Sequence, residues 1–594
     1  MLAWTIYISF LGALLLILLP KGSAAAARIL ALLTALATFA ITLVSFLQQR
    51  TGEMLTVTDV AWIPSLGIRY HLAADGISLV LLLLTGIIAV TGILFSWNIE
   101  HRAKEFFAFY LLLIGSVYGV FLSYDLLLLF VFYEIVIIPK YFLIAIWGST
   151  RREYGAMKLV LYSFIGSAMV LIGLIAAYVV AGAKSMALGD LAGFPFSAHF
   201  QMWAFPLVFV GFAILAGLWP FHTWAPTGHV AAPTAASMLL AGVVMKLALY
   251  SFAGSAMVLI GLLAAYATAG SHTMNLTALA QYPFPVSFQM WAFPLVFTGF
   301  AILAGMWPFH TWAPTGHVAA PTAASMLLAG VVMKLGAYGC LRVAMTLFPH
   351  GLDPWGFSFL GIGSWRTVFG LFAVTGILYG AAVALVQNDF KFVIGYSSVS
   401  HMGLVLLGLL TLTQIGIDGA VLQMFSHGIL AGLLFATVGR IVYERTHTRD
   451  LGALSKLQLA KAMPFAAWLF VIAGMASMGL PGFSGFIAEV QVLAGAWRAF
   501  PWFAILAGIG IVVGVAYTWR AMQRAFFSDL PALDATGAAV PIPEYEPVTW
   551  AEKAGVALLA GTSLLIGLYP RLLLDVIAPA VQALPHALLT GGRP

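Results

Sequence analysis

Titratable side chains inside long apolar runs are the residues of this sequence best suited to chemistry. The strongest candidates are Glu134, Lys246, Lys334, His401, His427 and Glu489. A charged residue at the centre of a membrane span costs about 2.5–3.5 kcal/mol even on the lenient insertion scale, so its presence indicates function. Carboxylates, lysines and imidazoles in a low dielectric can pass protons because each group alters the pKa of the next. The pattern therefore predicts a proton relay.

A purely structural role is the alternative for the same residues. A buried lysine or glutamate can pair with an opposite charge and hold two helices together. A buried histidine can pack between helices with its imidazole bonded to a serine or a carbonyl group. The residue types alone leave both roles open, and the structural role is easiest to accept for the histidines.

Breaks in the apolar runs are the second chemical clue. The segment Trp219–Pro226 interrupts a span and is followed by a further proline, Pro233, and a copy of it recurs at Trp307–Pro314. The segment Pro481–Gly485 interrupts a later span. Proline- or glycine-interrupted helices in corresponding halves of a chain indicate an inverted-repeat transporter with its ion path near the membrane midplane. The histidines at the breaks are weaker candidates for the relay: His222, His229, His310 and His317.

The composition indicates that these residues lie in a lipid bilayer. Of 594 residues, 62% are hydrophobic and only 8% are charged, against about 25% charged in soluble domains. A soluble globular protein, a disordered chain and a secreted disulfide scaffold are thereby excluded. The single cysteine, Cys340, allows no disulfide, iron–sulfur cluster or cysteine zinc site. The sequence also has no zinc-protease motif and no glycine-rich phosphate loop, so we expect no cofactor and no metal.

Sixteen apolar runs predict an all-α, polytopic membrane protein, because a backbone in lipid must satisfy its own hydrogen bonds. An outer-membrane barrel would need alternating ten-residue segments, which are absent. The first run has no basic residue before it, so we expect a retained helix rather than a signal peptide. The runs are 2–19, 25–48, 77–97, 106–123, 125–147, 158–181, 203–220, 232–268, 291–308, 320–346, 365–386, 393–412, 416–443, 464–496, 502–524 and 553–570.

Charge asymmetry between alternate loops predicts the orientation. One set of loops carries clusters of basic residues, whereas the alternate loops, such as 183–200 and 347–360, are nearly free of Lys and Arg. The positive-inside rule makes the first set cytoplasmic and puts both termini outside. The basic loop residues include Arg102, Lys104, Arg151, Arg152, Lys391, Arg440, Arg445, Arg449, Lys456, Lys461, Arg520 and Arg524.

An internal duplication is the most informative long-range feature. Gln201–Ala248 and Gln289–Gly336 differ at only three positions, with a period of 88 residues. The repeat units are 161–248 and 249–336, and Lys246 is the duplicate of Lys334. The apolar run 232–268 at the joint is either one long, kinked helix or two helices that meet without a proper loop. We favour two added spans, because three would invert the orientation of every later loop.

Several motifs together resemble the antiporter-like M subunit of the proton-pumping NADH:quinone oxidoreductase, respiratory complex I. The resemblance covers essentially the whole chain apart from the extra 88 residues. One motif, Tyr443–Asp450, looks specific to M subunits, whereas the others are shared with Mrp-type cation/proton antiporter subunits. The motifs are Phe132–Ile135, Tyr141–Gly148, Pro220–Pro226 with His229, Ala232–Ala235, Tyr396–Gly403 and Tyr443–Asp450.

The resemblance implies a fold, a set of relay residues and partners. The fold is two inverted five-helix units with broken helices, fourteen transmembrane helices in the family and about sixteen here. The family holds no redox centre in this subunit and moves protons in response to quinone reduction elsewhere. Glu134 matches its first-unit glutamate, Lys334 its central lysine and Glu489 its exit-side glutamate. His401 and His427 match its linking histidines. The implied partners are the antiporter-like L- and N-type neighbours in the membrane, with no nucleic acid.

Two departures from the family pattern stand out. The family has a lysine seven residues before the histidine of Pro-Phe-His, whereas this chain has Leu215 in one copy and Leu303 in the other. Lys140 lies six residues after Glu134, about 240° round a regular helix, but Pro139 and a long side chain could bring it back. Our hypothesis is that Lys140 replaces the missing partner of Glu134. The duplication, the second departure, offers an additional proton site at Lys246 or is a peripheral spacer.

The predicted function is therefore proton translocation within an NADH:quinone oxidoreductase, an enzyme of which this chain is a subunit. The alternatives are an Mrp-type sodium/proton antiporter subunit and a non-conducting scaffold subunit of a membrane oxidoreductase. The predicted organisation has four regions: N-terminal helices at 1–123, a first unit with the duplication at 124–346, a second unit at 347–524, and a cytoplasmic loop with a C-terminal helix at 525–594.

Overall fold

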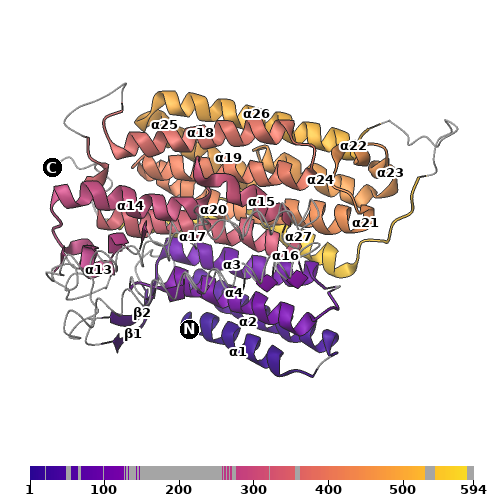
Figure 1. Cartoon of the computed structure of the whole chain (residues 1–594), viewed down its shortest axis with the longest axis horizontal. Helices are drawn as coiled ribbons and strands as arrows, with labels where there is room; N and C mark the ends of the chain where they lie inside the picture. The colour runs from indigo at the N-terminus through magenta and orange to yellow at the C-terminus, as the bar shows by residue number, and fades with distance from the viewer. Residues whose placement is uncertain are drawn as a thin grey trace, which may run out of the picture.

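A computed structural model describes the arrangement of most of the chain. The described residues are 1–20, 22–48, 55–63, 68–97, 99–125, 276–319, 322–354, 362–528 and 542–584, with scattered residues of 128–147 and 257–269. In these ranges the chain is mostly helical, and the long helices lie side by side along the longest axis of the molecule (Figure 1). Ten of the described helices are long and apolar enough to cross a membrane. The prediction of a polytopic helical membrane protein is confirmed at that level, while the count of sixteen spans stays a prediction.

Four helices and a hairpin form the N-terminal region. The central helix of this group, α3, is buried along its whole length because the other helices and the C-terminal region cover it. Asp75 caps its first turn by accepting a hydrogen bond from the backbone N–H of Ser78 at 3.0 Å. The elements are α1 Ala3–Leu18, α2 Ala24–Gln48, β1 Leu55–Ile63, β2 Ile68–Ala74, α3 Gly76–Phe95 and α4 Ala103–Leu122.

The β1–β2 hairpin is antiparallel and lies at one end of the helices (Figure 1). Its register runs from Leu55 opposite Ala74 to Ile63 opposite Ile68. Arg69 donates a hydrogen bond to Asp59 at 2.6 Å, and this contact holds the pKa of the Asp59 carboxyl below its usual value. The hairpin was not anticipated, because the prediction of an all-α fold considered only long apolar runs.

The middle region contains a broken helix and, after it, a continuous helical segment in which α and π turns alternate. The predicted interruption at Trp307–Pro314 is present: α14 ends at Ala304, Gly305 adopts a left-handed conformation at φ +83°, and a new helix starts at Trp312. The elements are α13 Leu276–Gln281, α14 Val286–Ala304, η4 Phe309–Thr311, α15 Trp312–Ala319, α16 Thr322–Leu327, η5 Leu328–Val332, α17 Met333–Gly339, η6 Cys340–Met345 and η7 Pro349–Leu352.

The C-terminal region supplies most of the long helices. The apolar run 464–496, taken as one span, is two helices, because the backbone breaks at 478–483, where Gly479 and Gly482 have positive φ angles. The elements are α18 Trp365–Val386, α19 Phe390–Leu410, α20 Gln414–Phe435, η8 Ala436–Tyr443, α21 Glu444–Thr446, α22 Leu451–Leu454, α23 Leu459–Ala462, α24 Pro464–Ser477, α25 Ser484–Ala499, α26 Pro501–Phe526, α27 Trp550–Leu568 and α28 Arg571–Gln582.

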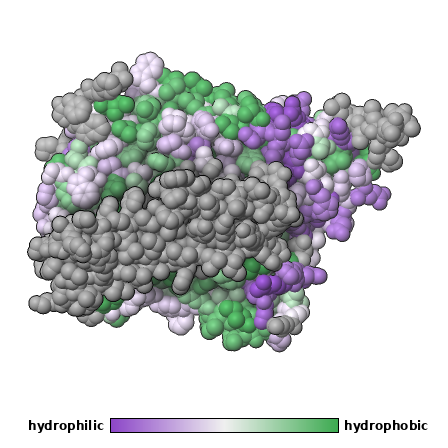
Figure 2. Space-filling view, viewed as in Figure 1, coloured by the Kyte–Doolittle hydropathy of each residue, from purple (hydrophilic) through white to green (hydrophobic). Residues whose placement is uncertain are grey.

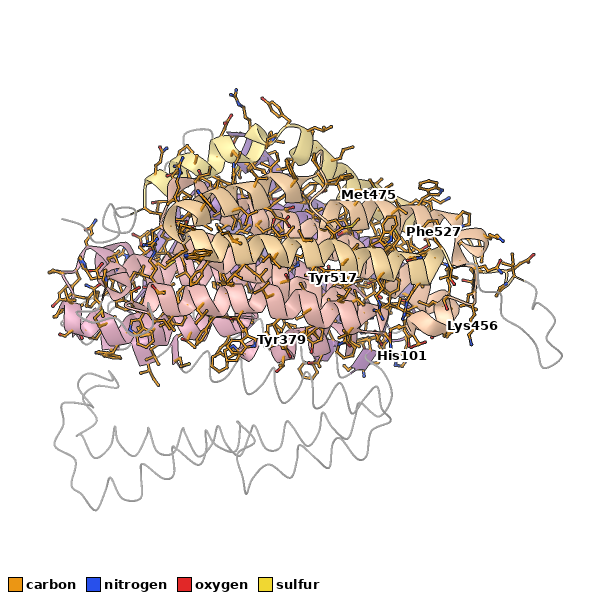
Figure 3. The ribbon with its side chains drawn as sticks, turned by 90° about the horizontal axis from the view of Figure 1, so that it is seen from above. His101, Tyr379, Lys456, Met475, Tyr517 and Phe527 are labelled. Carbon is orange, nitrogen blue, oxygen red and sulfur yellow. The ribbon has the colours of Figure 1, made fainter. Side chains whose placement is uncertain are left out.

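The two ends of the helical body differ in polarity. Hydrophilic residues gather at the end that carries α21–α23, while hydrophobic residues cover much of the sides of the helices (Figure 2). His101 and Lys456, from loops far apart in the sequence, lie at this same end (Figure 3). The hairpin lies at the opposite end (Figure 1). The basic loops at 99–102 and 444–463, which the structure describes, therefore lie at the same end.

Candidate functional site

Lys334 lies at the centre of the candidate site, with its side chain fully buried. It is the second residue of α17, just after the π-helical turn η5, and its Nζ folds back to the carbonyl oxygen of Ala329, five residues earlier. The same nitrogen lies 2.7 Å from Nδ1 of His427. No carboxylate pairs with Lys334 among the described residues, so neutral acceptors surround the amine.

Two glycines let the backbones of η5 and α20 approach closely enough for this contact. A Cβ atom at Gly428 would lie 2.6 Å from the carbonyl oxygen of Gly330, which is closer than Cβ atoms approach backbone oxygens in proteins. A larger residue at either position would separate the two elements. Because Gly428 follows His427 directly, the approach of the glycines brings the imidazole to Lys334.

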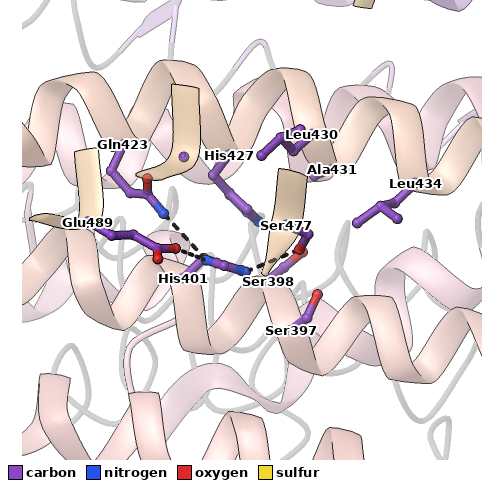
Figure 4. Close-up of a pocket in the computed structure, with 11 residues that line it drawn as sticks. Ser397, Ser398, His401, Gln423, His427, Leu430, Ala431, Leu434, Ser477 and Glu489 are labelled. Atoms are coloured by element: carbon purple, nitrogen blue, oxygen red, sulfur yellow. Dashed lines mark hydrogen bonds and ion pairs between the residues drawn. The ribbon is translucent and has the colours of Figure 1, made fainter. Parts of the chain in front are cut away.

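His401 connects His427 to a carboxylate (Figure 4). The two imidazole rings stack, with centroids 5.4 Å apart and an angle of 27° between their planes. Nδ1 of His401 lies 3.4 Å from Oε1 of Glu489 and 3.3 Å from Nε2 of Gln423. Its Nε2 lies 3.5 Å from the hydroxyl of Ser477. Lys334, His427, His401 and Glu489 thus form one row of titratable groups across α17, α20, α19 and α25.

A small cavity accompanies this row (Figure 4). Its volume, counted as the space open to the centre of a water molecule, is about 10 Å³. A space of this size with several polar neighbours holds about one water molecule, which could carry a proton between groups that do not touch. The polar side chains lining the cavity are Ser397, Ser398, His401, Gln423, His427, Ser477 and Glu489.

The two described histidines of the broken helix lie in different surroundings. His317 is fully buried in α15, with its ring 5.2 Å from that of Phe435 and both ring nitrogens lacking a hydrogen-bond partner in the described structure. Lys334 and Lys391 lie close enough to interact with His317 electrostatically. His310 is buried against the ring of Tyr379, 5.0 Å away. His317 therefore lies near the row, on the side of the basic loops where α19 begins.

Several predicted residues lie outside the described residues: Glu134, Lys140, Lys246, His222, His229 and Leu215. Leu303, the second-copy counterpart of Leu215, is described and is buried in α14. The apolar side chain thus occupies the place at which the family pattern has a lysine. The proposed substitution of Lys140 for that lysine stays a prediction.

A buried ionic cluster anchors α20 and η8 at the end of the basic loops. Glu552, in the first turn of α27, lies 2.6 Å from Nε of Arg440 and 2.9 Å from Nη2 of Arg445. Arg440 also pairs with Glu444. Glu552 thus pairs with both buried arginines, and Arg440 has a second carboxylate partner, which offsets the cost of burial. The cluster joins α27 to the helix that carries His427.

The motif Tyr443–Asp450 connects this cluster to the broken helix. Arg449 lies 3.2 Å from the carboxylate of Asp389, which caps α19, and donates a hydrogen bond to the carbonyl oxygen of Val318 at 3.0 Å. Burial raises the pKa of the Asp389 carboxyl above its usual value, and the nearby Arg449 opposes this shift. The motif therefore contacts the residue that follows His317.

Sequence reasoning missed three residues near the row. Gln423 and Ser477 are neutral, so nothing in their type separates them from other polar residues of the helices. Asp418 is a carboxylate within the apolar run 416–443, and a complete inventory of charges inside the runs finds it.

The geometry defines a class of protein: a multi-pass helical membrane protein with broken helices and a buried row of titratable side chains. The chain belongs to the family described as NADH:quinone oxidoreductase/Mrp antiporter, transmembrane, which it matches over residues 123–253 and 244–514. The two matches overlap at the joint of the duplication. The resemblance seen in the motifs is thereby confirmed.

Relatives and solved structures agree with this membership. The NADH-quinone oxidoreductase subunit M of Rhodobacter capsulatus is 33% identical over 89% of this chain and 84% of its own length. The protein of the same name from Escherichia coli is 30% identical over 98% of this chain and 97% of its own. A chain of respiratory complex I from Thermus thermophilus matches over the full length of both chains with a TM-score of 0.71 and 24% identity. A chain of the Mrp complex from Dietzia has the same TM-score at 18% identity over 98% of its length.

Proposed function

We propose that this chain is the proton-translocating subunit of an NADH:quinone oxidoreductase, in the place that subunit M takes in its relatives. The row from Lys334 through His427 and His401 to Glu489 carries the proposal. Its members contact one another inside the bundle of membrane-spanning helices. Titratable groups in such helices are energetically costly, so their presence indicates a function. The family membership agrees with the chemistry of the row.

Each member of the row has a part in the proposed mechanism. Lys334 holds the proton at the centre and donates it to Nδ1 of His427, which it already contacts. The rings of His427 and His401 stack and do not bond each other, so a water molecule in the cavity carries the proton between them. The proton then passes from His401 to Glu489. A change of charge at one group alters the proton affinity of the next, so quinone reduction in a neighbouring subunit drives transfer through electrostatic coupling.

The remaining assignments are finer parts of the same proposal. Uptake occurs near Glu134, assisted by Lys140, and release occurs beyond Glu489. The chain lies in the bacterial inner membrane with both termini outside, between L- and N-type neighbours. It is built from two inverted five-helix units and the duplicated pair of spans, in the four regions 1–123, 124–346, 347–524 and 525–594.

The test is proton pumping by the assembled complex in membrane vesicles. We expect Glu489→Gln to lower the number of protons pumped per NADH oxidised, because an amide cannot take up the proton that His401 delivers. Glu544→Gln, in the exposed segment before α27, is the matched control and leaves pumping unchanged. Unaltered pumping in Glu489→Gln would favour a non-conducting scaffold.

Sodium/proton exchange is the second candidate, because the family includes Mrp antiporter subunits and the fold matches one closely. Its distinguishing property is a sodium requirement. Transport that depends on sodium in vesicles free of other sodium pathways would replace the first proposal. The motif Tyr443–Asp450, which looks specific to M subunits, argues against this outcome.

A further inference from the structure

Asp418 is a second buried carboxylate on α20, the helix that carries His427. It lies four residues after the first residue of the helix, Gln414, and its exposed fraction is 8%. Gln423, which contacts His401, and the row residue His427 follow it toward the end with the basic loops. Asp418 therefore lies between the row and the opposite end of the molecule, which the proposed orientation places outside.

The partner of Asp418 is an amide and not a cation. Nε2 of Gln414 donates to both carboxylate oxygens, at 2.8 and 3.0 Å, and also lies 3.1 Å from the carbonyl oxygen of Ala578 in α28. No ion pair involves Asp418 in the described parts of the chain. A capping role does not account for the carboxylate either, because Thr413 already caps α20 through the N–H of Gly416.

Polar atoms lie on both helices between Asp418 and the row. Gln491 follows Glu489 by two residues on α25, and a Cβ at Gly419, the neighbour of Asp418, would lie 2.7 Å from the Cβ of Gln491. The Oε1 atoms of Gln491 and Gln423 are both buried and have no hydrogen-bond partner among the described residues. Buried carbonyl oxygens of this kind are acceptors for water.

We infer that Asp418 is a further proton-carrying residue, the acceptor that takes protons from Glu489 and releases them toward the outside. This inference rests on the proposed function. Water bonded to the two glutamine oxygens carries the proton from the carboxyl of Glu489 to the carboxylate of Asp418. Gln414 positions the carboxylate without neutralising it. A carboxylate that is not paired with a cation can gain and lose a proton without breaking an ion pair.

The test compares Asp418→Asn with Asp418→Glu in the assembled complex. Asparagine keeps an oxygen for Gln414 but cannot carry a proton, so protons pumped per NADH fall by the same factor as in Glu489→Gln. Glutamate restores pumping. Asp575→Asn, an exposed residue of the neighbouring α28, is the matched control and pumps normally. A merely structural Asp418 would instead tolerate asparagine.

The outcomes separate this inference from the proposed function. Normal pumping in Asp418→Asn together with reduced pumping in Glu489→Gln overturns the inference and leaves the function standing. Normal pumping in both variants overturns both. If Asp418→Asn does not assemble, infrared difference spectra decide: complex labelled with ¹³C in its aspartate carboxyls gives a label-sensitive protonated-carboxyl band during turnover, and Asp418→Glu lacks it. Absence of that band from the labelled, unmutated complex contradicts the inference.

Discussion

At the scale of single residues, the distinctive property of Lys334 is that its contacts in the described part of the chain are with neutral groups. An amine that contacts a carbonyl oxygen and an imidazole, with no carboxylate paired to it in the described structure, can release its proton to the imidazole. A lysine in a salt bridge would hold its proton more firmly. The contacts of Lys334 therefore suit transfer better than anchoring.

The duplication provides a matched pair of lysines with which to test this role. We expect Lys334→Ala to lower the protons pumped per NADH, because it removes the central member of the row. We expect Lys246→Ala to leave pumping near that of the unmutated complex, since the described row is built from the second copy. Pumping in vesicles, normalised to the amount of assembled complex, measures both.

The reverse result would be equally informative. A loss in Lys246→Ala comparable with that in Lys334→Ala would mean that the first copy carries protons too. The duplication would then add a site and would not be a peripheral spacer.

The residues of the row could be predicted from the sequence because a titratable group in an apolar run is conspicuous. Their contacts could not, since no spacing in the sequence says that His401 stacks on His427 or that Gln423 bonds the same ring. Those contacts depend on how α19, α20 and α25 pack. Glu134 and Lys140 stay predictions because they lie outside the described residues.

At the scale of elements, the breaks were predictable and the π turns were not. Proline and glycine clusters locate the interruptions near Trp307 and Pro481. Proline cannot continue a regular helix, and glycine readily adopts a left-handed backbone conformation. A π turn carries no such marker in its residue types. The structure nevertheless places η5 two residues before Lys334 and includes Arg440 in η8.

The ionic cluster at Glu552 gives a prediction about how elements are joined. We expect Glu552→Ala to destabilise the protein by about 3–5 kcal/mol, because it leaves Arg440 and Arg445 buried without their shared partner. The loss appears as a lower unfolding temperature of the purified complex. Glu544→Ala, which changes an exposed glutamate, should unfold at the unmutated temperature. Equal stability of the two variants would show that the cluster contributes little.

At the scale of the whole molecule, the two ends carry different charges, and this difference predicts which end faces the cytoplasm. Cys340 is fully buried, so the native chain offers little background for thiol labelling. We expect a cysteine at Ala453, exposed near α22, to react with an impermeant reagent only from the cytoplasmic side. A cysteine at Ala61, exposed in β1, should react only from outside.

Labelling of both positions from the same side would contradict the topology, because the two sites lie at opposite ends of the helices. Labelling from the exchanged sides would keep the fold and reverse its orientation. Intact cells and inverted vesicles together distinguish these results.

The overall architecture followed from the apolar runs, which correspond to the described spans within a few residues. The hairpin did not, because its strands are short and alternate between polar and apolar residues. The sequence predicted an interruption at Pro481–Gly485, but the run 464–496 was still counted as one span. Hydropathy alone cannot separate two apolar helices joined by a short break.

The π turn before Lys334 has a consequence for insertions and deletions. One residue advances an α-helix by about 100°, so removing a single residue from η5 would swing the ammonium group to another side of its helix. The composition and hydropathy of the segment would hardly change. The angular phase of this one turn, and not the identity of the lysine alone, therefore decides whether the amine meets an imidazole.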